Sequence, residues 1–432
     1  MANLMEKVVS LCKRRGFIFP SSEVYGGIGG FWDFGPLGVE LARNIKALWW
    51  KTMVVSRDEV YGLDSTIIHN PKAWEASGHT LSFTDPLREC KKCHLRFRAD
   101  HLKSDQCPEC GGKLASVKQF NLMFETFVGP AKETANKAYL RPETCQGIFL
   151  NFANVVNTVQ PKLPFGIGQI GKGFRNEVTT GNFIFRDREF EMMELEYFVK
   201  PGTDEKWFEY WRKERMSWHL RLGLPKKKLR YFEHPKKSLA HYSKRTVDIE
   251  YQYPFGWAEL EGIANRTDFD LKNHAKCSGK DLRFQDDKGK KFYPYVVEPS
   301  LGVERTFLAL ITEAYQEEKD KEGIRVILSL DPRLSPYKIA VFPLLANRPE
   351  LVKRARRVYE ELKPCFASTW DDIGNIGKRY RRQDEIGTPW CVTIDYQTLK
   401  DDTVTIRDRD SMKQERLQVD RLSRSFQNRL KS

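Results

Sequence analysis

Two pairs of cysteines form the most specific chemical pattern in the sequence. Cys90 and Cys93 enclose two lysines, and Cys107 and Cys110 follow after thirteen residues. Two such pairs at this separation can place four thiolates tetrahedrally around one zinc ion. Because no ligand position would remain open, the zinc would be structural. Two alternatives are a zinc-knuckle fold that has retained its cysteines but binds no metal, and a redox-active pair of cysteines.

A second polar pattern consists of Arg175, Asn176 and Glu177, followed after a polar loop by Phe190 and Glu194. An arginine at the end of one strand can hold a phosphate as a bidentate clamp. An aromatic ring on the facing strand can stack on a nucleotide base. The alternative for the Arg-Asn-Glu segment alone is surface charge on a hairpin.

A third pattern lies at an expected helix start. Gly302 lets another group approach the backbone closely, and Arg305 lies off the apolar stripe of the helix that follows. Glu298 and Ser300 come just before it. A single arginine at a helix start is more often solvated. This pattern therefore indicates a binding site only in combination with the two patterns above.

The composition indicates the kind of partner and the redox compartment in which these groups would act. A net charge of +14 favours a polyanionic partner, although a basic solvated surface would give the same excess. Nine cysteines without a secretion signal argue against a disulfide framework and for a reducing, cytoplasmic setting. We find no apolar run of the roughly 18 residues that a membrane helix needs, and we expect no membrane partner.

The elements that must position these groups follow from periodicity. Pro36 opens an amphipathic helix, since proline suits the first turn. The two strands that flank the polar loop show period-two alternation, with Phe190, Met192, Glu194, Glu196 and Phe198 on one face. The expected elements are a helix over 36–53, strands over 165–177 and 188–199, a strand pair around 247–261 and 296–299, and a helix from about 301.

Two insertions and a separate C-terminal unit complete the expected organisation. The cysteines lie in an insertion at about 84–118, and a Trp- and Lys-rich segment at about 204–245 is expected to be a helical insertion. Prolines at 331–336 mark a linker. Alternating elements after it, a strand at 338–342, a helix at 349–362, strands at 390–394 and 403–406 and a final helix, indicate a small α/β domain.

In this order and spacing, the second and third patterns resemble motifs two and three of the class II aminoacyl-tRNA synthetases. The Pro36 helix with its following strand resembles motif one, which forms the dimer interface in that class. Six further segments are most similar to the single-chain, homodimeric glycyl-tRNA synthetases, and together they span nearly the whole chain: FWDFGPLG at 31–38, RPET at 141–144, QGIF at 146–149, EGIANRTD at 261–268, EPS at 298–300 and GKRYRRQDE at 377–385.

The sequence departs from the family pattern at a few positions. Cys145 stands where the family usually has alanine, and Trp390 replaces a more usual tyrosine. Leu301 and the pair Val303 and Glu304 are local variants inside motif three. None of these changes removes a charged group that the chemistry needs.

The resemblance implies an α+β fold in two domains. Residues 1–335 would form a class II synthetase catalytic domain on an antiparallel sheet, with the zinc knuckle and the helical segment as insertions. Residues 336–432 would form a C-terminal α/β anticodon-binding domain. Its basic run at 378–382 would meet RNA phosphates, and Tyr380 could stack on bases. Alone, a five-residue basic run is more often a solvated face.

The resemblance also implies the reaction. Glycine attacks the α-phosphate of ATP, with Mg²⁺ as cofactor, to give glycyl-adenylate and pyrophosphate. The terminal ribose hydroxyl of glycine tRNA then attacks the adenylate carbonyl. No covalent enzyme intermediate is needed, so positioning and cationic stabilisation would do the work. The expected assembly is a homodimer.

The resemblance assigns the site residue by residue. Arg175 would hold the α-phosphate, Arg305 the γ-phosphate, Phe190 would stack on adenine, and Glu259 would bind Mg²⁺. The ATP site would comprise Arg175, Asn176, Glu177, Phe185, Arg186, Arg188, Phe190, Glu259, Leu260, Gly302 and Arg305. The glycine site would comprise Arg98, Glu143, Glu191, Glu194, Arg266, Glu298 and Ser300. For any one of these residues, an ordinary salt bridge or a surface position is the alternative.

Two other functions stay open at this point. A sister synthetase for threonine or proline would need other pocket residues. Synthetase-like folds also serve as non-catalytic accessory subunits, but such proteins lose the arginines of motifs two and three, and this chain keeps Arg175 and Arg305.

Overall fold

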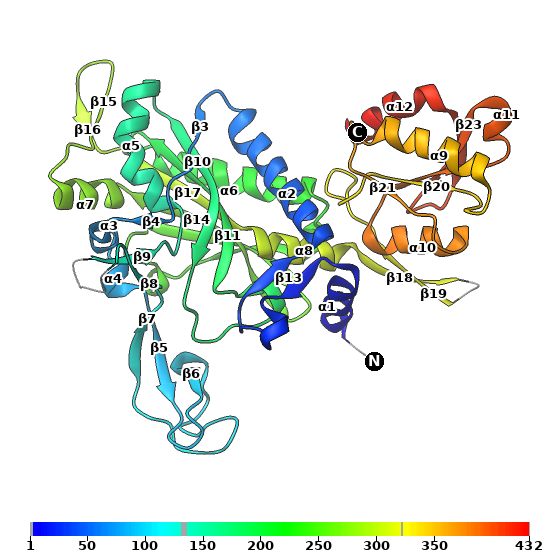
Figure 1. Ribbon diagram of the computed structural model, residues 1–432. Helices are drawn as coiled ribbons and strands as arrows, with labels where there is room; N and C mark the ends of the chain where they lie inside the picture. Colours follow the sequence, from blue (N-terminus) through cyan, green and yellow to red (C-terminus); the bar gives the residue numbers. More distant parts are fainter. Residues whose placement is uncertain (1–2, 131–135, 321–322, 432) are drawn as a thin grey trace.

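A computed structural model describes residues 3–130, 136–320 and 323–431 (Figure 1). Its main part surrounds a seven-stranded sheet of order β12-β13-β14-β17-β11-β10-β3, in which every pair is antiparallel except β10 with β3. The strands are β3 (Val60–Gly62), β10 (Phe165–Phe174), β11 (Glu189–Val199), β12 (Leu229–Glu233), β13 (Arg245–Tyr253), β14 (Gly256–Thr267) and β17 (Tyr295–Gly302). This confirms the expected α+β class with an antiparallel central sheet.

The helix expected from Pro36 is present as α2 (Pro36–Trp50). Its buried residues Leu37, Leu41, Ile45 and Trp49 recur every four positions and pack into the main core. A Cβ on Gly38 would lie 1.9 Å from the carbonyl oxygen of Phe17, so this close packing requires glycine. The helix continues into a π-helical turn, η2 (Lys51–Val55), slightly beyond the predicted end.

The two faces of the central sheet have different coverings. On one face, Met193, Leu195 and Tyr197 of β11 join a large apolar core with α1 (Leu4–Arg15), α2, α6 (Asp204–Arg221) and α8 (Val303–Ala314). On the other face, Phe198 packs with α5 (Cys145–Val159) and α7 (Phe269–Ser278). The remainder of that second face is left for the polar residues of β11, β14 and β17.

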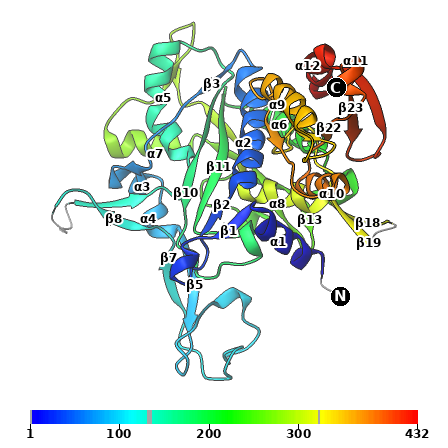
Figure 2. The ribbon, with the colours of Figure 1, turned by 45° about the vertical axis from the view of Figure 1, so that its right-hand side comes forward.

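The cysteine insertion is a small three-stranded sheet that projects from the body (Figures 1 and 2). Its strands are β5 (Thr84–Glu89), β6 (Arg96–Arg98) and β7 (Lys118–Asn121). Near its base lie α3 (Pro71–Ala76), α4 (His79–Ser82) and the sheet of β4 (Ile68–His69), β8 (Glu125–Phe127) and β9 (Lys137–Leu140). The remaining short strands are β1 (Ile18–Pro20), β2 (Trp32–Phe34), β15 (Phe284–Gln285) and β16 (Lys291–Phe292).

The second insertion is helical only in its first half. The sequence after α6 contains Gly223 and Pro225, which end the helix, and residues 229–233 then pair antiparallel with β13 as β12. The prediction of a helical insertion over 204–245 is therefore wrong beyond Leu222. The next expected helix, α8, begins at Val303, because Leu301 and Gly302 still pair with β11.

The chain after the 331–336 segment forms a separate sheet of order β21-β20-β22-β23-β24. Its strands are β20 (Ile339–Pro343), β21 (Ser368–Trp370), β22 (Trp390–Ile394), β23 (Thr403–Asp408) and β24 (Gln414–Gln418). Helices α9 (Pro349–Leu362) and α12 (Leu422–Lys431) cover one face, α10 (Ile376–Ile386) covers the other, and α11 (Thr398–Asp401) is a single turn. A hairpin of β18 (Tyr315–Asp320) and β19 (Gly323–Leu328) precedes this unit. None of the described helices is long and apolar enough to cross a membrane.

Candidate active site

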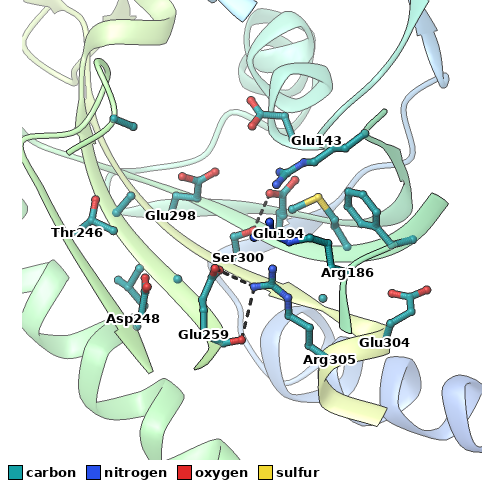
Figure 3. A pocket seen from close by; sticks show the side chains of 18 of the residues that line it. Glu143, Arg186, Glu194, Thr246, Asp248, Glu259, Glu298, Ser300, Glu304 and Arg305 are labelled. Carbon is teal, nitrogen blue, oxygen red and sulfur yellow. Dashed lines mark hydrogen bonds and ion pairs between the residues drawn. The ribbon is translucent and has the colours of Figure 1, made fainter. Parts of the chain in front are cut away.

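A cavity of about 320 Å³ opens on the polar part of the central sheet (Figure 3). Its walls come from β11, β13, β14 and β17, from the loop before β11 and from the start of α8. Among its lining residues are Glu143, Arg175, Glu177, Phe185, Arg186, Phe190, Glu194, Glu259, Glu298, Ser300, Gly302 and Arg305. The structure thus brings most of the predicted site residues to one place.

A β-bulge in β14 decides which acids reach this cavity. Ile249 pairs with Glu261, but the next residue, Glu250, pairs with Glu259, so Leu260 is an extra residue in the ladder. Without the bulge, Glu259 and Glu261 would share one face. With it, Glu259 lines the cavity, while Leu260 and Glu261 are buried on the opposite side.

Two arginines form the cationic end of the cavity, and aromatic rings hold both in place. The Arg305 guanidinium lies 4.7 Å from the ring centroid of Phe185 and contacts Glu259 through Nη1 at 2.8 Å (Figure 3). The Arg175 guanidinium lies between Phe83 and Phe190, at 5.4 and 5.3 Å from their centroids. Both groups are preorganised cations, the kind that stabilises charge developing on phosphate oxygens.

Carboxylates dominate the other end of the cavity. Glu194 accepts hydrogen bonds from the Thr144 backbone N–H at 2.7 Å and from Ser300 Oγ at 2.7 Å. Glu298 accepts from Arg266 Nη1 at 2.9 and 3.1 Å, and Arg266 also contacts Asp270. These contacts fix the orientation of each acid.

Within the described part of the chain, the donors to Glu143 all contact one of its two oxygens. Its Oε1 accepts from Cys145 Sγ at 2.9 Å and from Gln146 Nε2 at 3.1 Å, and lies 3.3 Å from His79 Nε2. His79 in turn contacts Ser77 Oγ through Nδ1 at 2.8 Å. Because the donors gather on Oε1, Oε2 is the oxygen left for a ligand in the cavity.

The pKa values of these acids reflect their environment. Burial raises the pKa of Glu298 to about 8; Arg266 opposes this shift, and the charges of Glu194 and Glu143 add to it. Burial acts on Glu143 in the same direction, but the charge and hydrogen bond of His79, with Arg266, hold its pKa well below the ordinary value. Crowded acids of this kind fit an ammonium group as ligand.

The four clustered cysteines have geometry that fits zinc. Cys90 Sγ lies 3.5 Å from Cys110 Sγ, Cys93 Sγ lies 3.7 Å from Cys107 Sγ, and all four sulfur atoms lie within 4.8 Å of one another. Tetrahedral Zn–S bonds of about 2.3 Å place neighbouring sulfurs about 3.8 Å apart. The backbone N–H groups of Lys92 and Cys93 point to Cys90 Sγ, as they would to a thiolate.

Several predicted site residues do not line the cavity. Arg98 pairs with Asp85 at 2.9 Å in the cysteine insertion, and Glu191 pairs with Lys46 at 2.7 Å. Arg188 donates to the backbone oxygens of Gly29 and Glu177. The remaining three are Asn176, whose backbone N–H bonds to Leu122, Leu260, which joins the apolar core, and Arg266, which acts behind Glu298.

Other lining residues were not predicted. Asp187, His234, Tyr242, Thr246, Asp248 and Glu304 all line the cavity. Burial, with the nearby charge of Glu304, raises the pKa of Asp187 to about 9. Thr246 and Asp248 alternate with the buried Val247 and Ile249, so period-two alternation in this expected strand is a signal that could have found them.

The basic run at 378–382 does not form one continuous RNA-facing surface. It lies on α10, where Arg379 is buried and donates to the backbone oxygens of Pro343 and Gly374. Tyr380 Oη contacts Thr393 Oγ1 at 2.6 Å under the Arg407 guanidinium. The prediction that the whole run meets phosphates is therefore wrong for Arg379, which stabilises the fold.

Comparison with known proteins gives a family match in the main part of the chain and another in the C-terminal unit. Residues 124–315 match the tRNA synthetase class II core domain (G, H, P, S and T), and residues 338–429 match the anticodon binding domain. The chain is 52% identical to the glycine–tRNA ligase of Streptomyces coelicolor, over 99% of both chains. It is 52% identical to that of Thermobifida fusca, over 99% of this chain and 98% of the relative.

A third relative extends the comparison. The glycine–tRNA ligase of Treponema denticola is 51% identical, over 96% of this chain and 94% of the relative. Together with the cavity's two arginines and its cluster of carboxylates, these similarities establish that the chain belongs to the glycine–tRNA ligase family, within the class II aminoacyl-tRNA synthetases.

Proposed function

We propose that this protein activates glycine with ATP and transfers it to the 3′ end of glycine tRNA. The observation that carries the proposal is a single cavity with two ring-held arginines at one end and a set of oriented carboxylates at the other. The arginines suit the phosphates of ATP, and the carboxylates suit the ammonium group of an amino acid. An aminoacyl-adenylate carries both a phosphate and an ammonium group, so one such ligand would use both ends of the cavity.

At the cationic end, Arg175 holds the α-phosphate and Arg305 the γ-phosphate, with Arg186 in the adjoining loop. Phe190 stacks on adenine. Glu259 and the neighbouring Asp248 are the acids available to bind Mg²⁺, which would neutralise phosphate charge when bound. The contact between Glu259 and Arg305 at 2.8 Å orients both groups before ATP arrives.

At the acidic end, Glu143, Glu194 and Glu298 bind the ammonium group, and Ser300 closes the space beside them. Arg266 orients Glu298, and Cys145, Gln146 and His79 orient Glu143. Selectivity is steric, because every competing amino acid is larger than glycine. Overlap with fixed side chains costs more than the roughly 1–3 kcal/mol that one missing methylene supplies, so no editing site is required.

The remaining features take supporting roles in this proposal. Cys90, Cys93, Cys107 and Cys110 hold a structural zinc. Residues 1–335 act as the catalytic domain and residues 336–432 as the anticodon-binding domain, in a cytoplasmic homodimer.

The decisive experiment is ATP–pyrophosphate exchange with each standard amino acid in turn, followed by charging of glycine tRNA. We expect exchange with glycine and little with alanine, serine, threonine or proline. Glu298→Ala should lose most glycine activation, and its residual activity should prefer glycine over alanine less strongly. Equal exchange with alanine or serine in the wild type would refute the glycine assignment, and preference for threonine or proline would favour a sister synthetase.

A further inference from the structure

A thiol and two carboxylates meet beneath the acidic end of the cavity. Cys145, Glu196 and Glu298 are all buried, and one donor atom of each lies within 4.8 Å of the other two. Cys145 begins α5, Glu196 lies on β11, and Glu298 lies on β17. Three elements distant in sequence therefore bring potential metal ligands to one point.

Glu196 is the unusual member of this group. It is fully buried, and neither carboxylate oxygen has a hydrogen-bond partner among the residues that the structure describes. Arg266, whose charge acts on Glu196, makes its hydrogen bonds to Glu298 and Asp270 instead. A buried carboxyl without a partner is unfavourable, so its position indicates that a cation belongs beside it.

The third donor determines which cation fits. A sulfur atom with two carboxylates is a mixed soft and hard set, which suits zinc and cadmium better than magnesium or calcium. Zinc bonds of about 2.3 Å to sulfur and about 2.0 Å to oxygen place ligand atoms some 3–4 Å apart. Small side-chain rotations would close the present separations of up to 4.8 Å to that spacing.

We propose that Cys145, Glu196 and Glu298 form a binding site for a thiophilic divalent cation, of the zinc and cadmium class, at the floor of the amino-acid pocket. The ion enters through the cavity, which Glu298 lines. On binding, the Cys145 Sγ–H bond and the O–H bonds of the two buried carboxyls break, their protons leave to solvent, and one metal–sulfur bond and two metal–oxygen bonds form. Because Glu298 is shared, an occupied site excludes glycine. This consequence, but not the binding itself, rests on the proposed function.

Cadmium-113 NMR of the whole zinc-free protein, reloaded with cadmium, tests the binding directly. We expect one resonance from the four-cysteine site and a second, in the range of mixed sulfur and oxygen ligands. Cys145→Ala should remove only the second resonance, and Cys145→Ser, which keeps the side-chain size, should do the same. Cys277→Ala is the matched control, because Cys277 is exposed and should leave both resonances unchanged. A wild-type spectrum with only the four-sulfur resonance, or a second resonance that survives both Cys145 variants, would overturn the proposal.

Pyrophosphate exchange at buffered free cadmium tests the consequence. Inhibition should be competitive with glycine, and Cys145→Ala and Glu196→Gln should each raise the inhibition constant by at least about tenfold, the scale seen when support of a metal is lost. Rates are expressed relative to each variant's own uninhibited rate. Inhibition competitive with ATP, or equal in wild type and Cys145→Ala, contradicts the exclusion of glycine.

One further titration separates this inference from the proposed function. Saturating glycine should displace the second cadmium resonance, whereas alanine, which chelates cadmium through the same groups but does not fit the pocket, should not. If no amino acid supports exchange, the proposed function fails, while the NMR result still decides the metal site. If exchange with glycine is normal and the second resonance is absent, the metal site fails alone.

Discussion

The two faces of the central sheet carry buried acids in opposite states of pairing. Behind the sheet, Glu261 is fully buried and contacts Arg215 Nε at 2.5 Å and His219 Nε2 at 2.6 Å. On the cavity face, Glu196 contacts no described donor, and the pKa of Glu298 is raised to about 8 by burial against the opposing effect of Arg266. The carboxylate of Glu261 thus contacts polar partners supplied by the fold itself, whereas that of Glu196 contacts none in the described part of the chain.

The side chains that contact Glu261 explain why this buried acid needs no ligand. Arg215 and His219 both come from α6, so the Glu261 cluster attaches this helix to β14. Arg215 also reaches Met53 Sδ in the turn after α2, at 3.0 Å. The same strand therefore anchors two helices through one acid and offers another, Glu259, to the cavity.

Replacing Glu261, the acid of the buried cluster behind the sheet, should have the largest effect, and the effect should be on stability. Glu261→Ala should lower the free energy of unfolding by about 3–5 kcal/mol, because Arg215 would stay buried without a counter-ion. Glu196→Gln on the cavity face should leave the stability unchanged or increase it, since the wild-type carboxyl makes no hydrogen bond to any residue that the structure describes. Urea unfolding of both variants measures the contrast.

A large loss of stability in Glu196→Gln, as great as in Glu261→Ala, would show that the two faces do not differ in the way described. Glu250→Gln is a suitable control on the neighbouring strand β13. Its carboxylate pairs with the half-exposed Arg230, and such pairs contribute about 0–1 kcal/mol.

The second-largest effect should come from replacing the arginines of the cavity face. Arg175→Ala and Arg305→Ala should each slow pyrophosphate exchange by about two to three orders of magnitude, because each removes a preorganised cation from the phosphate site. Stability should change little, since both side chains line the cavity. Arg230→Ala, outside the cavity, is the control. Near-normal exchange by Arg175→Ala would remove it from the catalytic assignment.

The raised pKa of Glu298 predicts a pH dependence of intermediate size. Below pH 8 this carboxyl is mostly protonated in the free enzyme and lacks the charge that an ammonium group needs. The value of kcat/KM for glycine should therefore rise about tenfold per pH unit toward pH 8 and then level off. Glu298→Gln should abolish this transition. A flat profile in the wild type would mean that Glu298 is already ionised at lower pH.

The smallest effect on the central sheet should come from the cysteine insertion, which projects from it (Figure 1). Purified wild-type protein should contain about one zinc per chain at this site, and Cys107→Ser should lower the metal content and loosen the insertion. The unfolding transition of the main core should remain in place. Wild-type protein that contains no metal when purified without chelator, or a Cys107→Ser variant whose insertion stays as ordered as in the wild type, would refute the structural zinc.

The sequence predicts elements best where a single local pattern decides them. The helix at 349–362, α9 in the C-terminal unit, has a proline at its first position and a strong apolar stripe, and it forms within those bounds. The segment at 204–245 shows the limit. Its first half forms α6, but the pairing of β12 with β13 depends on a strand that follows later in the chain, which local composition does not reveal.

For the candidate site too, the sequence predicts the position of some residues correctly and of others wrongly. Arg175, Phe190, Glu259 and Arg305 reach the cavity as expected, because motif order carries their geometry. Alternation puts Glu196 on the same face as Glu194, but it finds no hydrogen-bond partner among the described residues because Arg266 turns to Glu298 and Asp270. Arg98 was expected near glycine, yet the insertion's own Asp85 binds it. Side-chain competition of this kind is not visible in spacing.

The extra residue in β14 also has a genetic consequence. Loss of the codon for Leu260 would remove the bulge and make Glu259 and Glu261 neighbours in the sequence, which strict alternation still places on opposite faces of the sheet. Both the nucleotide site and the buried Arg215 would keep their acid. Loss of a codon elsewhere in this strand would instead move the side chains on one side of the deletion to the other face. The bulged position is therefore where a change of length in this strand should do the least damage to the two acids.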